Sequence, residues 1–520
     1  MNYLKKKLPL VLFTIFTTLL FSLLILTANY RHYPIDGFKD AILVGGHWFA
    51  SMLGIFCIVI ILSINKYVFA VLFPLFTFVS SATAYFTWQF DVSINSAIFE
   101  SFFYTNAGEV SGYITTPLIL LLIFSLALSA LLVVIRFRFR WTKHQIGTVL
   151  IIFAFSFSAF WLVNKKRYNT LLVRAPFSYY LAAKNYKAEY KEVKKERFML
   201  GEDAYTNADS LTVVFVIGEA LRADHIQLNG YHRVTMPKME KRGVISFPKV
   251  FSPFTHTAQS LPYIFTRATQ DSLAPKFEES SFIDLFKKSS FKTSWVGNQD
   301  PTETYQFFVN ECDTVFINKP QFSGYGNIKK LDSDLIEPFE NIVRRGYSKQ
   351  LINIHIIGNH WWYNSNFPDT FAVFTPILQD KTISPSNRER MINSYDNATL
   401  FTDYVLDKMI ESLEDKSALL IFLSDHGQSF GENGKWLHAN SNPVEQNPAC
   451  FIWLSEKYRE KYPERFEALI ANKDMSINSS FLFHTIIDGS LISSKYLNLK
   501  QSLFSSEFQP EKEDIDLGTE

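Results

Sequence analysis

The first third of the chain consists largely of long, uninterrupted apolar stretches. Five of them are each about 18–24 residues long, which is enough for an α-helix to cross the hydrocarbon core of a bilayer. They cover residues 8–27, 41–64, 67–88, 115–135 and 146–163. The first stretch alone would also suit a signal peptide, but no convincing small-residue cleavage site follows it, so we interpret it as a retained helix. The pattern predicts an α-helical membrane domain with five spans over residues 1–164.

Lysine and arginine are distributed unevenly around these stretches. Residues 5–7 are all lysine, Lys66 lies between the second and third stretches, and residues 136–143 form a basic loop, whereas residues 89–113 contain neither lysine nor arginine. Because positively charged loops stay in the cytoplasm, we expect a cytoplasmic N-terminus and a C-terminal domain on the outer side. The basic residues 165–167 run against this rule, but long domains translocate largely regardless of charge.

The pattern changes after the last apolar stretch. Residues 165–205 form a basic, tyrosine-rich connector that suits either an interfacial helix on the bilayer or a solvated linker helix. In the predicted catalytic domain, residues 206–520, the stretch 206–505 alternates short apolar runs with helix-like stretches such as 388–413, and an acidic tail follows. This alternation predicts an α/β domain with a mainly parallel central sheet and helices on both faces.

Four of the apolar runs are followed at once by polar side chains. The runs and the residues after them are 211–218 with Glu219, 293–297 with Asn298 and Gln299, 351–358 with Asn359 and His360, and 418–424 with Asp425 and His426. Continuous apolar runs are typical of buried parallel strands, and ligands bind beyond the carboxyl ends of such strands. Two carboxylates and two imidazoles at one sheet edge suit a transition-metal ion, and we predict zinc.

A candidate nucleophile lies in residues 251–269, which are predicted to form a loop that runs into a helix. Thr257 would lie at or near the helix N-terminus, where free N–H groups and the helix dipole stabilise an alkoxide or a bound phosphate. Alternatively, Thr257 is only the N-cap of that helix. Thr255 and Ser260 are rival hydroxyl groups that the spacing does not exclude.

The remaining histidines offer further chemistry. His360 and His438 can bind a second ion, hold phosphate oxygens or shuttle protons, although a single histidine is more often a structural donor. We interpret His225, His256 and His355 as structural.

Composition excludes some classes of protein. A length of 520 residues suits a membrane part plus one large globular domain, and a net charge of +1 gives no overall basic signal for nucleic acid. Cys57 lies inside a predicted span, so Cys312 and Cys450 form at most one disulfide or remain free thiols.

Five segments together resemble the lipid A phosphoethanolamine transferases. They are residues 218–237, 256–262, 295–300, 358–363 and 425–439. The resemblance covers nearly the whole chain and includes the number of spans and the order of domains and motifs. It implies a bacterial inner-membrane, multi-pass enzyme whose periplasmic domain has the alkaline-phosphatase/sulfatase fold. It also implies a monomer that uses zinc, phosphatidylethanolamine as donor and lipid A of lipopolysaccharide as acceptor, with polymyxin resistance as the consequence.

The resemblance assigns roles to individual residues. Thr257 matches the family's threonine nucleophile within the pattern T-A-x-S-x-P, and His360 and His438 match a pair of histidines that bind substrate or an extra zinc ion. The implied metal ligands are Glu219, Thr257, Asp425 and His426.

The implied lipid-substrate site includes a polar triplet at four-residue spacing in the outer loop. Thr105 and Glu109 match the triplet, and Ser101 stands where the family usually has Asn. On a helix this spacing places all three side chains on one face, as an ordinary polar surface helix also does. Asn298 and Gln299 are predicted to bind substrate as well.

The sequence also departs from the family. Two cysteines usually bracket the nucleophile, and those positions are Pro253 and Tyr263 here. Most of the family's disulfides must therefore be missing, which puts the rigidity of this loop in question but not the chemistry.

Other functions compete with this interpretation. The alternatives are a phosphoethanolamine transferase acting on a core sugar or another glycan, and a phosphoglycerol transferase of the same superfamily. The segments around Thr257 and His438 favour phosphoethanolamine. A sulfatase is disfavoured because its C/S-x-P-x-R nucleophile pattern is absent. A membrane-anchored sensor of the same fold would be expected to have lost one of Glu219, Thr257, Asp425 and His426.

Overall fold

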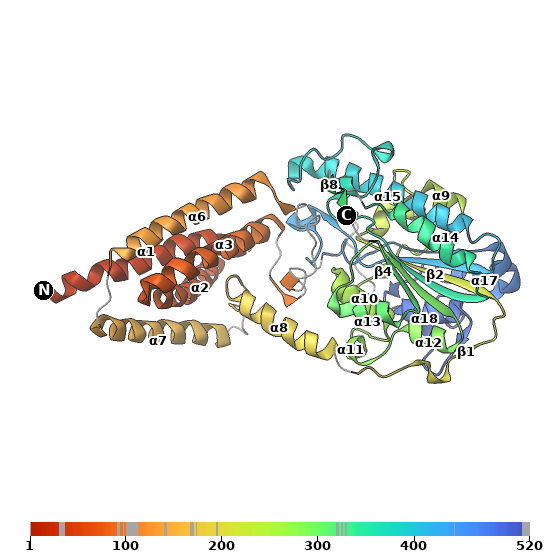
Figure 1. The fold of residues 1–520 in the computed structure, drawn as a ribbon, viewed down its shortest axis with the longest axis horizontal. Coiled ribbons are helices and arrows are strands. Elements are labelled where there is room, and N and C mark those ends of the chain that lie inside the picture. Colours follow the sequence, from red (N-terminus) through yellow and green to blue (C-terminus); the bar gives the residue numbers. More distant parts are fainter. Residues whose placement is uncertain are drawn as a thin grey trace. The chain divides into compact units, whose positions relative to one another are not determined.

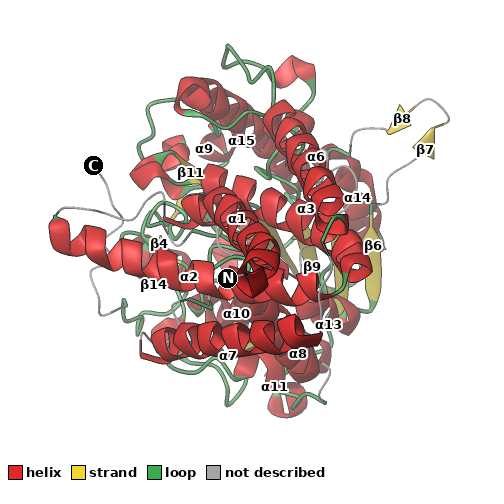
Figure 2. Cartoon of the chain, turned by 90° about the vertical axis from the view of Figure 1, so that its left-hand side faces the viewer, coloured by secondary structure: helices red, strands yellow, loops and turns green. Residues whose placement is uncertain are grey.

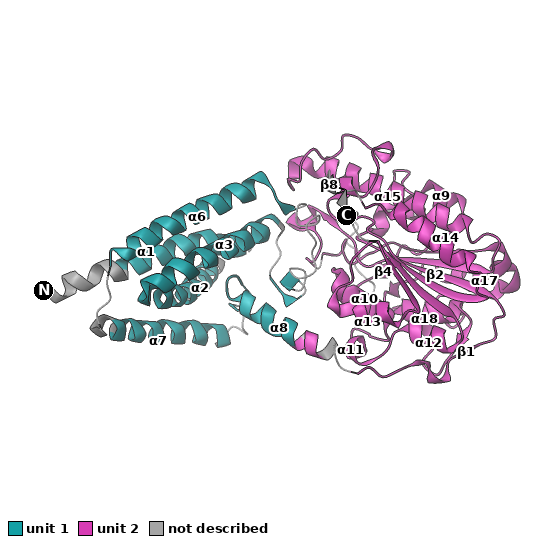
Figure 3. Cartoon of the chain, viewed as in Figure 1, with its two compact units in different colours: residues 1–103, 113–187 teal, residues 104–112, 188–520 magenta. Residues whose placement is uncertain are grey.

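The structure is a computed structural model of the full chain. It describes residues 2–30, 37–90, 94–96, 98–99, 113–139, 143–166, 171–172, 174–193, 196–318, 322–323, 326–327, 330–440 and 442–511. The chain divides into two compact units, residues 1–103 with 113–187 and residues 104–112 with 188–520 (Figure 3).

The N-terminal unit consists of helices joined by loops over the residues that the structure describes (Figures 1 and 2). The helices are α1 (Asn2–Tyr30), α2 (Phe38–Ile64), α3 (Lys66–Phe90), α6 (Thr116–Phe137), α7 (Lys143–Lys166) and most of α8 (Ser178–Val193). Four of them contain apolar segments long enough to cross a membrane, namely Leu12–Tyr30, Ala41–Ile64, Lys66–Gln89 and Thr116–Phe137. The fifth predicted span lies on α7, whose apolar stretch in the described residues, Val149–Lys165, is shorter. The placement of the predicted linker helix on the bilayer surface stays a prediction.

Some polar groups inside this helical unit bond to neighbouring helices. The hydroxyl groups of Ser81 on α3 and Ser125 on α6 lie 2.7 Å apart. Arg136 is only 2% exposed, and its guanidinium donates to the carbonyl oxygens of Ser63 and Phe139. These hydrogen bonds to backbone carbonyls offset the free-energy cost of removing the cation from water. The buried guanidinium thereby joins the ends of α2 and α6.

The C-terminal unit is built on a seven-stranded sheet with the order β3-β13-β10-β2-β9-β5-β6. The strands are β3 (Ile245–Ser246), β13 (Cys450–Leu454), β10 (Ala418–Ser424), β2 (Leu211–Gly218), β9 (Lys349–His355), β5 (Lys292–Gly297) and β6 (Thr314–Ile317). The five strands from β10 to β6 are parallel, whereas β13 and β3 extend the sheet antiparallel. The predicted α/β domain with a mainly parallel sheet is confirmed.

Helices cover both faces of this sheet, with α14 and α15 above it and α10, α12, α13 and α18 below it in Figure 1. The longer helices are α10 (Thr257–Phe265), α12 (Phe282–Lys288), α13 (Glu303–Glu311), α14 (Ile336–Arg344), α15 (Arg388–Glu411), α17 (Pro463–Asn472) and α18 (Phe481–Gly489). Short helices are α9 (Pro237–Lys241), α11 (Pro275–Glu278) and α16 (Glu456–Lys461). The lower helices bury Phe265, Phe282 and Phe483 in a hydrophobic core on that face of the sheet.

Short two-stranded sheets complete the unit. They pair β1 (Tyr205–Thr206) with β15 (Ile492–Ser493), β4 (Val250–Phe251) with β14 (Ile477–Asn478), β7 (Phe322–Ser323) with β8 (Gly326–Asn327), and β11 (Ser429–Phe430) with β12 (Trp436–Leu437). Cys57, Cys312 and Cys450 are buried and free, so the two cysteines of this unit do not pair.

The strand register brings the predicted strand ends together. Gly218 at the end of β2 lies opposite Ser424 at the end of β10, so the chain leaves both strands at the same level of the sheet. The prediction that β9 continues to residue 358 is wrong, because the strand ends at His355. Beyond it the backbone N–H groups of Ile357 and Gly358 donate to the buried carboxylate of Asp332 instead of extending the sheet. His360 therefore lies on a loop and not at a strand end.

Candidate active site

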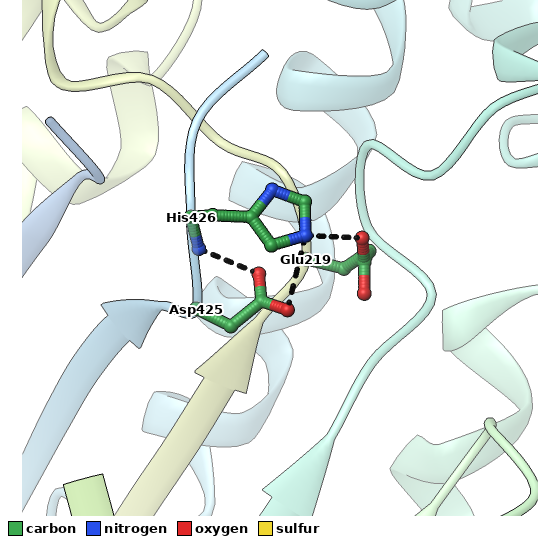
Figure 4. Close-up of side chains that lie close together, drawn as sticks. All are labelled: Glu219, Asp425 and His426. Carbon is green, nitrogen blue, oxygen red and sulfur yellow. Dashed lines mark hydrogen bonds and ion pairs between the residues drawn. The ribbon is translucent and has the colours of Figure 1, made fainter. Parts of the chain in front are cut away.

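Three buried side chains meet where β2 and β10 end, and we call Glu219, Asp425 and His426 the metal cluster (Figure 4). The Nε2 atom of His426 lies 3.4 Å from Oε1 of Glu219 and 3.4 Å from Oδ2 of Asp425. One ligand atom from each residue lies within 4.8 Å of the others. Of the four residues predicted to converge at the sheet edge, Glu219, Asp425 and His426 therefore meet in one cluster, whereas His360 is not part of it.

Hydrogen bonds orient two members of the metal cluster toward its centre. Nδ1 of His426 donates to the carbonyl oxygen of Gly427 at 2.8 Å, which leaves a lone pair on Nε2. Oδ1 of Asp425 accepts from the backbone N–H groups of His426 at 2.8 Å and Ala220 at 3.1 Å, so Oδ2 faces the cluster. Ala220 has a φ of +55°, a left-handed conformation that is strained for a residue with a side chain.

Glu219 divides its two carboxylate oxygens in a similar way. Oε2 accepts from the amide of Gln299 at 3.2 Å and from the hydroxyl group of Thr257 at 3.1 Å, while Oε1 faces His426. The Gln299 amide also donates to the carbonyl oxygen of Ile356 at 2.7 Å, which holds it in place. The candidate nucleophile therefore contacts the metal cluster directly.

The cluster has the properties of a metal site. Oδ2 of Asp425 and Nε2 of His426 are buried and make no hydrogen bond within the described residues. Buried polar atoms in native proteins almost always have partners, and an ion bound between these atoms would satisfy both. Two carboxylate oxygens and one imidazole nitrogen are donors that suit a transition-metal ion.

Thr257 is the first residue of α10. The N-cap of this helix is His256, whose Nδ1 accepts from the backbone N–H of Ala258 at 3.2 Å. The alternative that Thr257 is only an N-cap is therefore wrong. The rival hydroxyl group of Ser260 donates to the carbonyl oxygen of Phe254 at 3.3 Å, away from the metal cluster.

Three further imidazoles gather beside the metal cluster, and we call His256, His360 and His438 the imidazole group. The ring of His438 lies 4.6 Å from that of His426 and 6.3 Å from those of His256 and His360, measured between centroids. Burial lowers the pKa of His256 to about 4, with the nearby His426 adding to the effect. Burial and the neighbouring imidazoles also hold the pKa of His438 well below its ordinary value.

The loop that carries His438 is under unusual backbone constraint. Leu437 and Ala439, on either side of it, have φ angles of +62° and +68°. The backbone N–H of Ala439 donates to the carbonyl oxygen of Thr255 at 3.0 Å, and Nδ1 of His438 lies 3.0 Å from Oε1 of Gln428. Backbone strain of this kind persists only where the surrounding contacts determine the conformation, which is common at functional sites.

Comparison with known protein families agrees with this geometry. The family model for sulfatases matches residues 211–489, which is more than half of the chain. A second model, for the phosphoethanolamine transferases EptA and EptB, matches residues 52–184. The chain belongs to the sulfatase family and is a phosphoethanolamine transferase.

Named relatives extend over most of this transferase. The phosphoethanolamine transferase EptA of Escherichia coli K12 is 27% identical over 422 residues, which cover 75% of this chain and 76% of the relative. The phosphatidylethanolamine transferase Mcr-1 of Escherichia coli is 26% identical over 471 residues, covering 82% of this chain and 85% of the relative. Together with the four apolar helices, these matches agree with the predicted multi-pass membrane enzyme that carries a sulfatase domain.

Solved structures share the fold. The integral membrane lipooligosaccharide phosphoethanolamine transferase A of Neisseria meningitidis aligns with a TM-score of 0.81 at 22% identity, covering 94% of this chain and 97% of that chain. The periplasmic domain of EptC from Escherichia coli, in complex with zinc, aligns with a TM-score of 0.55 at 21% identity, covering 61% of this chain and 92% of that chain.

Not all predicted site residues of the transferase reach the metal cluster. The amide nitrogen of Asn298 donates to Asp332 at 2.8 Å, and its oxygen accepts from Asn318 at 2.9 Å, so this side chain joins loops of the domain. Of the pair Asn298 and Gln299, Gln299 is the one that contacts Glu219. The predicted outer-loop triplet, Ser101, Thr105 and Glu109, lies outside the described residues, and its role stays a prediction.

Two residues of the site were missed by sequence reasoning. His256 was interpreted as structural, and the structure does make it a helix cap, but its ring also joins the imidazole group. Gln428 was not singled out, although it accepts from His438 and donates to Tyr363 at 2.7 Å. Their closeness in the sequence to predicted site residues could have identified both, because His256 precedes Thr257 and Gln428 follows residues 425–427.

The nucleophile loop is held without the family's bracketing cysteines. Tyr263 packs edge-on against Phe254 with centroids 5.3 Å apart, and its hydroxyl donates to Asn478 at 2.9 Å. The ammonium of Lys276 lies 4.2 Å from the centroid of the Phe254 ring. Aromatic and cation–π contacts thus supply noncovalent support in this loop, each worth about 0.5–2 kcal/mol.

Proposed function

We propose that this enzyme transfers phosphoethanolamine from phosphatidylethanolamine to a phosphate group of lipid A, through a covalent intermediate on Thr257. One observation carries the proposal: the Thr257 hydroxyl lies 3.1 Å from Oε2 of Glu219, whose other oxygen faces His426 at 3.4 Å. A hydroxyl group on a metal-site carboxylate, at the start of a helix, is placed as a nucleophile would need to be.

The metal cluster fits zinc best. Glu219, Asp425 and His426 would supply three ligand atoms, and the Thr257 hydroxyl, which donates to Glu219, would supply a fourth. The solved EptC domain that shares the fold contains zinc, which supports the same choice here. When bound, the ion would lower the pKa of the Thr257 hydroxyl and offset negative charge on the phosphoryl group.

In the first step the Thr257 oxygen attacks the phosphorus of phosphatidylethanolamine. The new Oγ–P bond forms as the P–O bond to diacylglycerol breaks, and the diacylglycerol oxygen takes up a proton. The Thr257 hydroxyl donates to Oε2 of Glu219, so this oxygen would be the first to accept the hydroxyl proton. Phosphoethanolamine is then held on Thr257 as a phosphodiester.

In the second step an oxygen of a lipid A phosphate attacks the same phosphorus. The Oγ–P bond breaks, and Thr257 regains its proton. Nδ1 of His438 donates to Gln428, so Nε2 has a lone pair that can accept a proton from the acceptor. His360, whose ring lies 6.3 Å from that of His438, would bind the phosphoryl oxygens or share this task.

The choice of substrates fits the domain organisation. Donor and acceptor are both lipids, so a catalytic domain attached to spanning helices works where its substrates lie. The donor follows the name of the relative Mcr-1, a phosphatidylethanolamine transferase, and a lipooligosaccharide acceptor is named for the Neisseria meningitidis structure. The product gains an ammonium group, so cationic peptides such as polymyxin should bind the modified surface less tightly.

A second acceptor has one observation in its favour. The Kdo(2)-lipid A phosphoethanolamine 7''-transferase of Escherichia coli is 28% identical over 284 residues, covering 52% of this chain and 49% of that relative. Its name indicates a different acceptor position, so a core sugar is the alternative to a lipid A phosphate.

Peptide mass spectrometry of the purified full-length protein tests the proposal. After incubation with phosphatidylethanolamine and zinc, we expect the peptide that contains Thr257 to gain the mass of phosphoethanolamine. Thr257→Ala should gain nothing and keep its zinc, whereas Thr257→Ser keeps a hydroxyl group and should form a slower adduct.

Other outcomes would correct specific parts of the proposal. A phosphoglycerol adduct formed only from phosphatidylglycerol would show that the donor is wrong. Full transfer activity in Thr257→Ala would exclude this nucleophile. Release of the adduct by a core oligosaccharide but not by lipid A would make the sugar the acceptor.

A further inference from the structure

Arg222 is a buried residue in the segment that follows β2 and Glu219, and its backbone is fixed from two sides. Its N–H donates to the hydroxyl group of Tyr395 on α15 at 2.8 Å. On the other side Arg222 forms an isolated β-bridge with Pro448. The Arg222 side chain therefore extends from a rigid base that also carries a member of the metal cluster.

The aliphatic stem of Arg222 packs against the residue that orients His426. A Cβ atom built on Gly427 would lie 3.2 Å from Cγ of Arg222 and 2.2 Å from the carbonyl oxygen of Val444. The backbone of Gly427 is thus enclosed so closely that a side chain would not fit there. The carbonyl oxygen of Gly427 accepts from Nδ1 of His426 at 2.8 Å. The stem of Arg222 therefore supports the acceptor that directs Nε2 of His426 into the metal cluster.

The guanidinium of Arg222 contacts the next residue of the same loop. Its Nη1 donates to the carbonyl oxygen of Gln428 at 3.1 Å, and Oε1 of Gln428 lies 3.0 Å from Nδ1 of His438. Asp224 and Glu432 accept from the remaining edges of the guanidinium, at 2.6–2.8 Å. Because a planar guanidinium between two carboxylates has a fixed direction, its donor to Gln428 is fixed as well.

We infer that Arg222 is a positioning residue, which holds Gly427 and Gln428 so that His426 and His438 keep their working orientations. The inference rests on the proposed function and deepens it. Arg222 acts through the loop, since its described hydrogen bonds go to Asp224, Glu432 and Gln428. One side chain thereby links the orientation of a metal ligand to that of an imidazole proposed to move a proton. Loss of partners of this kind typically costs about 10–100-fold in metal affinity or activity.

Three variants separate this role from a general contribution to stability. Arg222→Met keeps most of the stem and removes every hydrogen bond of the guanidinium. Arg222→Lys keeps the positive charge and a donor for the Gln428 carbonyl. Arg465→Met is the matched control, because Arg465 also donates to a carbonyl oxygen and a carboxylate, both of Asp488 at 2.8 Å, on helices outside the site.

The measurements use full-length protein. They are the Kd for zinc in competition with a chelator, the rate of transfer from the Thr257 adduct to lipid A, and the melting temperature. For Arg222→Met we expect the Kd for zinc to rise about 10-fold and the transfer rate to fall about 10–100-fold. Arg222→Lys should have intermediate values of both. Arg465→Met should lower the melting temperature alone.

A double variant tests the route through Gln428. If Arg222 acts on His438 through this residue, Arg222→Met combined with Gln428→Ala should transfer no more slowly than the slower single variant. Two independent contributions would instead multiply their losses.

Several results would overturn the inference. Wild-type zinc affinity and transfer rate in Arg222→Met would reduce Arg222 to a stabilising ion pair. Equal losses in Arg465→Met would mean that general loosening of the domain causes them, and multiplied losses in the double variant would exclude the route through Gln428. If Arg222→Met does not fold, wild-type values of Kd and rate in Arg222→Lys at a lowered melting temperature would count against the inference in the same way.

Failure of the proposed function is recognised separately. Zinc affinity is measured without turnover, so this part of the inference can hold or fail whatever the enzyme transfers. If the wild-type protein forms no adduct on Thr257 with phosphatidylethanolamine and zinc present, the proposed function itself fails.

Discussion

The metal cluster and the imidazole group lie side by side but are held in place by different means. The metal cluster follows directly from two neighbouring parallel strands, and backbone groups at Ala220, His426 and Gly427 orient its side chains. The imidazole group lies on a helix start and on loops, where a side chain such as Gln428 sets the orientation of a ring.

This difference indicates how each part of the site tolerates change. Backbone hydrogen bonds at adjacent strand ends depend on the sheet register, which every residue of the strands supports. Loop side chains depend on single contacts, which one substitution can remove. We therefore expect the metal cluster to provide the invariant chemistry and the imidazole group to tune rate and substrate binding.

Loss of a carboxylate from the metal cluster should have the largest effect. Asp425→Asn keeps the oxygen that accepts from Ala220 and His426, but it places a neutral amide opposite Nε2 of His426. We expect zinc content to fall and adduct formation to slow by about 10³-fold or more. Metal analysis and the Thr257 adduct assay measure the two effects.

Asp332→Asn is the matched control, since Asp332 is another buried carboxylate beyond the strand ends. It accepts from Asn298, Ile357 and Gly358 and lies outside the metal cluster. This variant should lose stability and retain zinc. Equal zinc loss in both variants would mean that general loosening of the loops, and not the ligand set, controls metal binding.

Loss of the hydrogen bond that orients one imidazole should reduce activity less than loss of a metal-cluster carboxylate. Gln428→Ala removes the acceptor that holds Nδ1 of His438, so the ring should lose its fixed orientation. Outer-shell changes of this kind typically cost about 10–100-fold in activity. We expect such a loss of transfer to acceptor, with the zinc content of the metal cluster unchanged.

Gln428→Glu is the control, because it keeps an oxygen acceptor for His438 and should retain most of the activity. If Gln428→Ala lost zinc as fully as Asp425→Asn, the two parts of the site would form one unit and the comparison drawn above would be wrong.

The smallest expected effect concerns pH and the loop that follows His438. Glu445 is buried and accepts from Ser429 and from the backbone N–H of Asn440. Burial raises the pKa of this carboxyl group from 4.5 to about 7. Below pH 4.5 the group is protonated in both folded and unfolded protein, and its contribution to stability is fully present. That contribution is lost as the pH rises through about 7, because the folded protein must then bury a charge.

Glu445→Gln keeps a neutral side chain at every pH, so the stability of this variant should depend less on pH than that of the wild type. Relative to the wild type, we expect its melting temperature to rise by roughly 2–4 °C between pH 5 and pH 8. Burial also raises the pKa of Glu311 and of Asp403 to about 7. Both carboxyl groups are present in the variant and in the wild type, so their contributions to the pH dependence of stability cancel in the comparison. Glu456→Gln, at an exposed position, controls for the change in net charge. A constant difference in melting temperature across this range would contradict the prediction.

Much of the fold and of the metal cluster was predictable from local sequence. The strands predicted before Glu219 and Asp425 end where expected, because continuous apolar runs have no stable place except the sheet interior. The end of β9 was predicted too late, since Asp332, far away in the sequence, takes the backbone donors of Ile357 and Gly358. Local patterns carry no information about such a partner.

The sequence by itself determined the apolar helices, the parallel strands and the residues of the metal cluster, because each depends on side chains within one short segment. Only the tertiary structure decided that His256 joins the imidazole group, that Gln428 holds His438, and that Asn298 bonds to Asp332. These choices depend on loops that pack together from distant parts of the chain. A polar residue in a loop has many possible partners, and only the completed packing of the domain selects one of them.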